Sequence, residues 1–262
     1  MDLLGKSAIV TGAGGGGCGR AIAMRLAAEG AAVAVADVNE ASGRETVRRI
    51  AAAGGRAEFF KADVRHEAEV RALVAAAETT FGGLDVLVND ASLAIFPETS
   101  LDDWFANVAV DLIGAMYAIR HGVEAMRRRG GGAIVNIGSV SALCHGGRES
   151  QAPGYDTAKA GVMRLTTAFG PQAAREGIRI NCLVPGWIGS PPVKAYWESL
   201  TPEQRQAREV PSVLLGVEEI AEAVVTLIAD ERLAGRVLVW WNGQPPALIP
   251  IGDPGYVRLE PL

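Results

Sequence analysis

The chain has 262 residues, of which 49% are hydrophobic, and this composition supplies enough apolar surface for one large α/β domain. Thirty acidic residues against 25 lysines and arginines give a net charge of −5, so the field of the whole chain repels nucleic-acid phosphates and anionic lipids. Charged residues interrupt each apolar stretch before the roughly 18 to 20 positions that a membrane span needs. The sequence therefore predicts a cytoplasmic protein with neither a nucleic-acid nor a membrane partner. The scattered cysteines and histidines predict neither a metal site nor a disulfide framework.

Runs of β-branched and apolar residues alternate with longer amphipathic runs, a pattern typical of strands joined by crossover helices. Most of the strand candidates are continuous apolar runs, which favours parallel strands buried on both faces. The sequence thus predicts a single α/β domain over residues 1–262, with a seven-stranded parallel sheet flanked by helices. The expected strands are Ser7–Thr11, Ala32–Asp37, Arg56–Asp63, Leu84–Asn89, Ala133–Gly138, Arg179–Val184 and Val237–Trp241.

Helical patterns fill the segments between these strands, such as Asn39–Ala53 and His66–Phe81, each followed by a pair of glycines that ends a helix. Residues 187–213 are rich in proline and aromatic side chains, and we expect them to form a substrate-binding insert of loops and helices. The tail, residues 244–262, carries five of the 13 prolines. We expect it to be extended and docked on another surface, not part of the sheet.

A run of glycines follows the first strand and leads directly into a helical pattern. Glycines allow a backbone to approach a pyrophosphate, and the helix N-terminus offers unpaired N–H groups to it. Two registers of a GxGxxG motif fit, one starting at Gly12 and one at Gly14, and a plain flexible turn is the alternative. The residues expected at the pyrophosphate are Gly12, Gly14, Gly17, Cys18 and Gly19.

The second predicted strand ends in Asp37, 18 residues beyond Gly19. A carboxylate at this position accepts hydrogen bonds from the ribose hydroxyls of NAD and repels the 2′-phosphate of NADP. The alternative for Asp37 is a helix N-terminal cap. Asp63 and Asn89 follow the third and fourth strands, so these polar side chains line one crevice at the carboxyl ends of the strands. The sequence predicts NAD as the cofactor.

Tyr155 and Lys159 begin a long helical pattern and are four positions apart, so they share one helix face. A nearby ammonium stabilises phenolate, which lowers the tyrosine pKa from about 10 and makes the phenol a usable acid/base. Ser139 ends the preceding strand at the same edge and can donate a hydrogen bond to a carbonyl oxygen. The alternative to a catalytic pair is the ordinary packing of such residues in a helix: a tyrosine in the core and a lysine whose aliphatic part lies on apolar surface.

These motifs together resemble the short-chain dehydrogenase/reductase family of NAD(P)-dependent oxidoreductases, which have a single Rossmann-type domain. The resemblance implies that Tyr155 is the general acid/base, that Lys159 holds the nicotinamide ribose, and that Ser139 polarises the substrate. It also implies homo-oligomers, tetramers or dimers. Further cofactor contacts implied by it fall on Asp63, Val64, Asn89, Ala91, Tyr155, Lys159, Pro185, Gly186, Ile188 and Ser190.

Several residues depart from the pattern of that family. The glycine turn has one residue more than usual, and Asp90 replaces an asparagine. Asp111 stands where the family has a catalytic asparagine, so we include it among the candidate catalytic residues. A carboxylate near Lys159 would partly cancel the effect of the ammonium on Tyr155. The alternative is that Asp111 points away and satisfies local backbone donors.

The function expected from these observations is NAD-dependent interconversion of a secondary alcohol and a ketone on an apolar small molecule that is cyclic or otherwise bulky. Two alternatives stay open: an impaired NAD-binding sensor or partner protein, and a non-redox isomerase or dehydratase that retains NAD. The expected substrate-binding residues are Leu93, Ile95, Phe96, Ser139, His145, Trp187, Tyr196 and Trp197.

Overall fold

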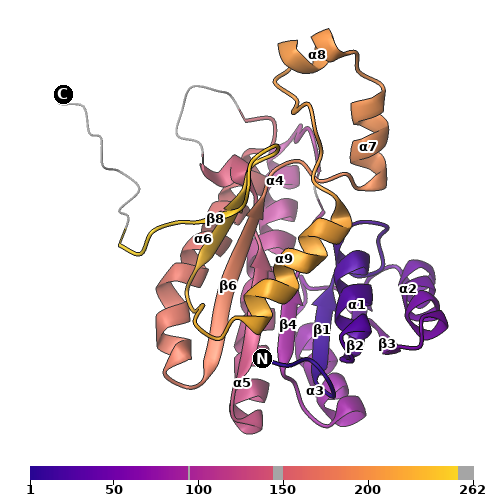
Figure 1. Ribbon diagram of the computed structural model, residues 1–262, viewed down its shortest axis with the longest axis vertical. Helices are drawn as coiled ribbons and strands as arrows, with labels where there is room; N and C mark the ends of the chain where they lie inside the picture. Colours follow the sequence, from indigo (N-terminus) through magenta and orange to yellow (C-terminus); the bar gives the residue numbers. More distant parts are fainter. Residues whose placement is uncertain (94, 144–149, 253–262) are drawn as a thin grey trace.

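The computed structural model describes residues 1–93, 95–143 and 150–252, and its centre is one twisted sheet (Figure 1). The strands lie in the order β3-β2-β1-β4-β5-β6-β7-β8, and all neighbouring pairs are parallel except β7 and β8. The predicted α/β fold is therefore confirmed, with eight strands in the described residues instead of seven. The strands are β1 (Ser7–Thr11), β2 (Ala32–Asp37), β3 (Arg56–Lys61), β4 (Val86–Asn89), β5 (Gly132–Ile137), β6 (Ile178–Pro185), β7 (Val237–Trp240) and β8 (Ala247–Leu248).

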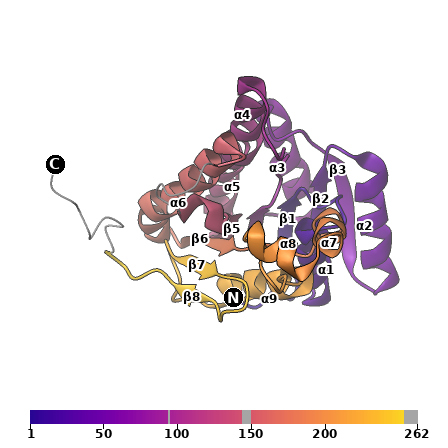
Figure 2. The same ribbon diagram turned by 90° about the horizontal axis from the view of Figure 1, so that it is seen from above.

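Helices cover both faces of this sheet, as Figure 2 shows from above. One face packs against α1 (Cys18–Ala28), α2 (Glu40–Ala52) and α9 (Val217–Ala229). The other face packs against α3 (Glu67–Phe81), α5 (Ala115–Arg129) and α6 (Pro153–Ala174). The central strands β1, β4 and β5 are buried along their whole length, which explains their continuous apolar sequence. No helix in the described ranges is long and apolar enough to cross a membrane.

The described part of the tail contradicts the expectation that it stays outside the sheet. Its residues Ala247 and Leu248 form β8, which pairs antiparallel with β7, and the Ile249 N–H donates to the Val237 carbonyl at 3.0 Å. Without β8, the strand β7 would end the sheet with a row of unpaired backbone groups. Prolines on both sides limit the new strand to two residues, because proline has no N–H to donate.

The order of strands reverses between β1 and β4, and ligands of such sheets bind beside this point at the carboxyl ends of the strands. Several short elements lie at this edge: α4 (Leu101–Val108), a π-helical segment η1 (Ala109–Gly114) and a 3₁₀ turn η2 (Val140–Leu143). In the predicted insert, α7 (Pro191–Glu198) and α8 (Pro202–Ala207) stand above the sheet edge at the top of Figure 1.

Candidate active site

Ser139, Tyr155 and Lys159 come together at the carboxyl end of β5. Tyr155 and Lys159 lie one turn apart near the start of α6, with the Lys159 Nζ 5.4 Å from the centre of the Tyr155 ring. The Ser139 side chain acts on the Tyr155 phenol in the direction that lowers its pKa. Its Oγ also accepts a hydrogen bond from the Ser141 hydroxyl at 3.0 Å. A phenol, a cation and a hydroxyl donor thus share one site, which is the set of groups needed to move a proton to or from a substrate oxygen.

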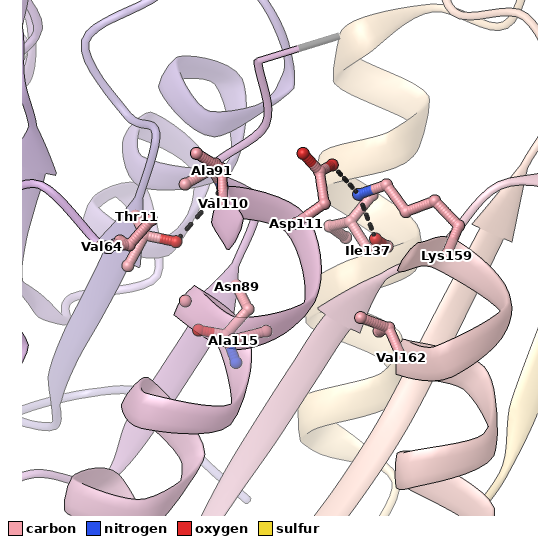
Figure 3. Close-up of a pocket in the computed structure, with 11 residues that line it drawn as sticks. Thr11, Val64, Asn89, Ala91, Val110, Asp111, Ala115, Ile137, Lys159 and Val162 are labelled. Atoms are coloured by element: carbon pink, nitrogen blue, oxygen red, sulfur yellow. Dashed lines mark hydrogen bonds and ion pairs between the residues drawn. The ribbon is translucent and has the colours of Figure 1, made fainter. Parts of the chain in front are cut away.

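Asp111 points at Lys159, not away from it (Figure 3). Its Oδ1 lies 2.9 Å from the Lys159 Nζ, and the two side chains are 0% and 4% exposed. The same ammonium donates to the Ile137 carbonyl at 2.9 Å. Asp111 belongs to the π-helical segment η1, and such single irregular turns inside helices often occur at functional sites. The alternative in which Asp111 satisfies only local backbone donors is therefore wrong.

Burial and this ion pair together shift the pKa values of Tyr155 and Lys159. Burial by itself lowers the pKa of Lys159, but the Asp111 carboxylate and Tyr155 outweigh it, so the pKa of the ammonium is raised. Burial raises the pKa of Tyr155, Lys159 opposes this, and Asp111 adds to it, so the pKa of the phenol also ends above its usual value. Lys159 lowers the tyrosine pKa as expected, but burial of the phenol outweighs it and Asp111 adds to the rise, so the expected net direction is wrong.

A small cavity lies beneath this ion pair, between β1, β4, β5, η1 and α6 (Figure 3). The Asn89 Oδ1 and the Asp111 Oδ2 are buried in its wall without a hydrogen-bond partner among the described residues, whereas the Asp111 Oδ1 is held by its ion pair with Lys159. Of the strand-end side chains expected to line one crevice, Asn89 lines this cavity, and Asp37 and Asp63 do not. The lining residues are Thr11, Val64, Asn89, Ala91, Val110, Asp111, Gly114, Ala115, Ile137, Lys159 and Val162.

The glycine loop packs so tightly that side chains cannot replace its key glycines. A Cβ on Gly14 would lie 2.7 Å from the Asp37 side chain, and a Cβ on Gly19 would lie 2.4 Å from the Gly12 carbonyl oxygen. Helix α1 begins at Cys18, and its N-cap residue Gly17 supplies no side-chain cap to the first N–H groups. An open backbone cradle at an uncapped helix N-terminus fits the pyrophosphate of a dinucleotide.

Asp37 closes this cradle at the carboxyl end of β2. Its Oδ2 accepts the Gly14 N–H at 2.8 Å, and its Oδ1 accepts the Asn39 N–H at 2.8 Å. The cap of α2 is instead Asn39, whose side chain accepts the Ser42 N–H. The capping alternative for Asp37 is therefore wrong. The carboxylate sits beside the loop where an adenosine ribose would lie, and the neighbouring Val38 is 57% exposed and carries no charge.

The next two strand ends differ in what holds their side chains. Asp63 lies just beyond β3 and forms an ion pair with Arg65, whose hydrogen bond lowers the carboxyl pKa. Val64 packs so closely on η1 that a Cβ at Gly114 would come within 2.7 Å of it. After β4, the Ala91 N–H donates to the Thr11 hydroxyl at 3.2 Å, so the β1 and β4 loops are tied together.

Asp90 and Cys18 flank the start of α1. The Asp90 carboxyl lies beside the Gly19 backbone, and burial raises its pKa to about 7, against the opposing effects of Lys159 and the Gly19 N–H. At neutral pH this carboxyl is thus partly protonated, which reduces its repulsion of an anion at the helix N-terminus. Burial also raises the pKa of the Cys18 thiol, so this cysteine is a packing residue with little thiolate character.

Residues 185–190 return the chain from β6 to the glycine loop. A Cβ at Gly186 would lie 2.1 Å from the Asn242 Oδ1, so only glycine fits after Pro185. Ile188 pairs with Leu215 in an isolated parallel bridge. Ser190 then lies next to the loop, 3.5 Å from where a Gly17 Cβ would stand. The structure thus brings Ser190, which is expected to bind the cofactor after the sixth strand, beside Gly17 of the glycine loop.

The expected substrate-binding residues fall into two groups around this edge. Leu93 and Phe96 are 44% and 63% exposed on the segment before α4, with Ile95 partly buried between them. In the insert, the Trp187 and Tyr196 rings stack with centres 6.3 Å apart. Trp197 supports the insert itself, because its indole N–H donates to the Pro211 carbonyl at 2.8 Å and Arg205 stacks on its ring. His145 lies outside the described residues.

Comparison with known proteins identifies the family. Residues 6–200 match the short chain dehydrogenases. The chain belongs to the short chain dehydrogenase family. It is therefore an oxidoreductase that acts on CH–OH groups, and the family binds NAD(H) or NADP(H). The resemblance inferred from the glycine turn and from the serine, tyrosine and lysine is confirmed.

Several relatives within this family are named for activity on ring alcohols. The 2,5-dichloro-2,5-cyclohexadiene-1,4-diol dehydrogenase of Sphingobium indicum is 40% identical over 195 residues, which cover 72% of this chain and 75% of that protein. The cyclohexanol dehydrogenase of an Acinetobacter species is 35% identical over 231 residues, 86% of this chain and 88% of its own. A solved 7α-hydroxysteroid dehydrogenase, complexed with NADH and 7-oxo glycochenodeoxycholic acid, has a TM-score of 0.82 at 28% identity, covering 90% and 93% of the two chains.

Sequence reasoning missed some residues that hold the site of this short chain dehydrogenase together. Asn242 accepts the Trp187 N–H at 2.8 Å and donates to the Trp187 carbonyl at 2.8 Å, which fixes the segment after β6. Asn136 accepts from Asn89 at 2.8 Å and donates to Thr166 at 2.9 Å, which links β4, β5 and α6. An asparagine inside an apolar strand was the available signal, because a buried amide needs partners.

Proposed function

We propose that this protein is an NAD-dependent dehydrogenase that interconverts a secondary alcohol and a ketone on a cyclic or otherwise bulky apolar molecule. The observation that carries the proposal is the meeting of Ser139, Tyr155 and Lys159 at the sheet edge that also holds the glycine cradle and Asp37. A proton acceptor and a site for a hydride carrier are the two requirements for oxidising a carbinol.

In the proposed reaction, the chain's own residues handle the oxygen of the substrate. The Ser139 hydroxyl and the Tyr155 phenol hold that oxygen, and the Tyr155 phenolate takes its proton during oxidation. Lys159, held between Asp111 and the Ile137 carbonyl, stabilises the phenolate. The bound dinucleotide supplies the acceptor for the hydride that leaves the carbinol carbon. In the reductive direction, the phenol returns the proton to the oxygen.

Asp37 supports the choice of NAD over NADP. Its carboxylate is held at the end of β2 by the backbone N–H groups of Gly14 and Asn39, so its position at the cradle is fixed. The 2′-phosphate of NADP would bring a second anion to this carboxylate, and Val38 offers no cation to offset the repulsion.

The insert and the named relatives support a ring-shaped apolar substrate. Trp187 and Tyr196 form an aromatic stack at the edge of the site, and Leu93 and Phe96 expose apolar surface before α4. We propose that residues 187–213 cover the substrate. Relatives named for cyclohexanol and a cyclohexadiene diol make ring alcohols the first compounds to test.

The test is incubation with NAD and a panel of cyclic and linear secondary alcohols, followed by absorbance at the NADH wavelength. Net NADH with cyclohexanol-like alcohols is the expected outcome. Tight NAD binding without turnover would instead indicate a sensor, and a changed substrate without net NADH would indicate an isomerase or dehydratase. The homo-oligomer implied by the family and the cytoplasmic location stay predictions, which sedimentation and cell fractionation test.

A further inference from the structure

Helix α6, which carries Tyr155 and Lys159, begins without a cap from its own flank. Its N-cap residue, Ala152, has no side chain that can accept a hydrogen bond. Pro153 has no N–H, and the Asp156 N–H already donates to the Ala152 carbonyl at 3.0 Å. The first turn therefore has two backbone donors that need a partner from elsewhere, those of Gly154 and of Tyr155 itself.

One carboxylate from a distant segment accepts both donors. Glu98, in the loop before α4, accepts the Gly154 N–H through Oε2 at 2.7 Å and the Tyr155 N–H through Oε1 at 2.8 Å. The pairing is reciprocal, because the Glu98 N–H donates to the Gln151 carbonyl at 2.8 Å. Glu98 thus caps α6 as a charged residue at the positive end of its dipole.

Glu98 is itself held by a buried amide. The Asn107 Nδ2 donates to the Glu98 Oε1 at 2.5 Å, and the Asn107 side chain is fully buried on α4. The Asn107 Oδ1 also accepts the Ile95 N–H at 3.4 Å. The carboxylate therefore connects the first turn of α6 to the loop that carries the expected substrate-binding residue Ile95.

Close backbone packing makes this connection rigid. A Cβ on Gly154 would lie 2.5 Å from the Trp104 Cα, so α4 and the start of α6 touch through their backbones. Four residues beyond Asn107, Asp111 forms the ion pair with Lys159. The segment from Glu98 to Asp111 thus binds α6 at two points one turn apart. Glu98 binds the backbone N–H of Tyr155, and Asp111 binds the side chain of Lys159.

We propose that Glu98 is a positioning residue for Tyr155, which fixes the phenol relative to the substrate loop by binding the tyrosine's own backbone N–H. The inference rests on the proposed function. A shift of about 1 Å in a reacting group can reduce a rate by about 10²-fold. Loss of this cap should therefore lower kcat. Binding of the dinucleotide depends on β1 and β2 and should change little.

The experiment compares Glu98→Gln with Asp103→Asn, a matched loss of charge in the same segment. Asp103 caps α4 by accepting the Thr99 and Ser100 N–H groups at 2.8 and 3.0 Å. Glutamine keeps one acceptor oxygen and turns an NH₂ toward the second donor of α6. With cyclohexanol and NAD, we expect kcat to fall about 10- to 100-fold in Glu98→Gln, with KM within about threefold, and to stay unchanged in Asp103→Asn.

A titration with NADH, followed by its fluorescence, counts the intact sites, so kcat refers to folded protein. Glu98→Asp keeps the charge and both acceptor oxygens on a shorter side chain, so it tests the proposal if the glutamine variant does not fold. Its kcat should lie between those of wild type and Glu98→Gln. A wild-type kcat per intact site in both Glu98 variants would overturn the proposal.

The double variant separates positioning from simple structural support. If Glu98 acts through Tyr155, Glu98→Gln should cause no further loss of rate in a Tyr155→Phe background. The same fold loss in both backgrounds would overturn the proposal and leave the proposed function standing. A wild-type rate for Tyr155→Phe alone would overturn the proposed function, and the positioning role with it.

Discussion

The strand edge and the insert above it are built in opposite ways. At the edge, Lys159 is 4% exposed and held by two contacts of 2.9 Å, to Asp111 and to the Ile137 carbonyl. In the insert, only Leu200 and Val210 are buried among residues 191–213, and short helices carry the exposed Tyr196. The edge is part of the cooperative core, whereas the insert opens at lower free energy because few apolar contacts hold it.

This difference suggests a division of labour between the two regions. Groups that move a proton need fixed positions, and the sheet with its buried ion pair supplies them. A surface that admits a bulky substrate needs to change its conformation. An exposed aromatic insert can change its conformation without disturbing the core. Substitutions at the edge should therefore change kcat or cofactor choice, and those in the insert should change KM.

The largest effect is expected from Tyr155→Phe at the edge. Removing the phenolic hydroxyl removes the proton acceptor, so kcat should fall at least about 10²- to 10⁴-fold while NADH binding persists. Steady-state rates with cyclohexanol and NAD, beside an NADH fluorescence titration, measure both quantities. Turnover near that of the wild type would end the assignment of Tyr155 as acid/base.

Cofactor choice should respond next, through Asp37 and Val38. Asp37→Ala removes the carboxylate that repels a 2′-phosphate, so the ratio of kcat/KM for NAD over NADP should fall at least about tenfold. Adding Val38→Arg should reverse the preference, because its guanidinium binds the phosphate. The measurement is kcat/KM with each cofactor. Equal use of both cofactors by the wild type would contradict this account.

In the insert, Trp187→Ala should raise KM for a bulky ring alcohol about 5- to 10-fold and leave kcat within about twofold. The loss corresponds to about 1 kcal/mol of apolar contact between the Trp187 ring and the substrate. A small linear alcohol that does not reach the insert serves as the control substrate. A large fall in kcat with unchanged KM would show that Trp187 acts in the chemical step, like the residues of the strand edge, and would contradict the proposed difference between the two regions.

Asp111→Asn should have the smallest effect on the maximal rate and a clear effect on the pH profile. Asp111 raises the pKa of Tyr155, so its neutralisation lowers that pKa. Oxidation needs the phenolate, and the rising limb of kcat/KM should therefore move to lower pH. Asp103→Asn, on the preceding helix, is the control. Superimposable profiles of wild type and Asp111→Asn would show that the ion pair has no influence on the phenol.

Local sequence determined the elements and the main chemistry, because these depend on short-range patterns. Continuous apolar runs predict parallel strands, the glycines after β1 predict a phosphate cradle, and the four-residue spacing puts Tyr155 and Lys159 on one helix face. The sequence also puts Asp37, Asp63 and Asn89 at the same edge, since all carboxyl ends of a parallel sheet meet there, but it did not show that only Asn89 of the three lines the cavity.

Tertiary structure alone decided which charges meet and what supports them. The sequence pattern did not show whether Asp111 faces Lys159 or its own backbone. In the structure Asp111 lies in the π-helical turn η1 and forms an ion pair with Lys159. Glu98 binds Gly154 and Asn242 binds Trp187, each more than fifty positions away in the sequence. No local sequence pattern predicts such contacts. Burial also overturned the expected direction of the Tyr155 pKa, because desolvation depends on the whole surrounding fold, which no local motif specifies.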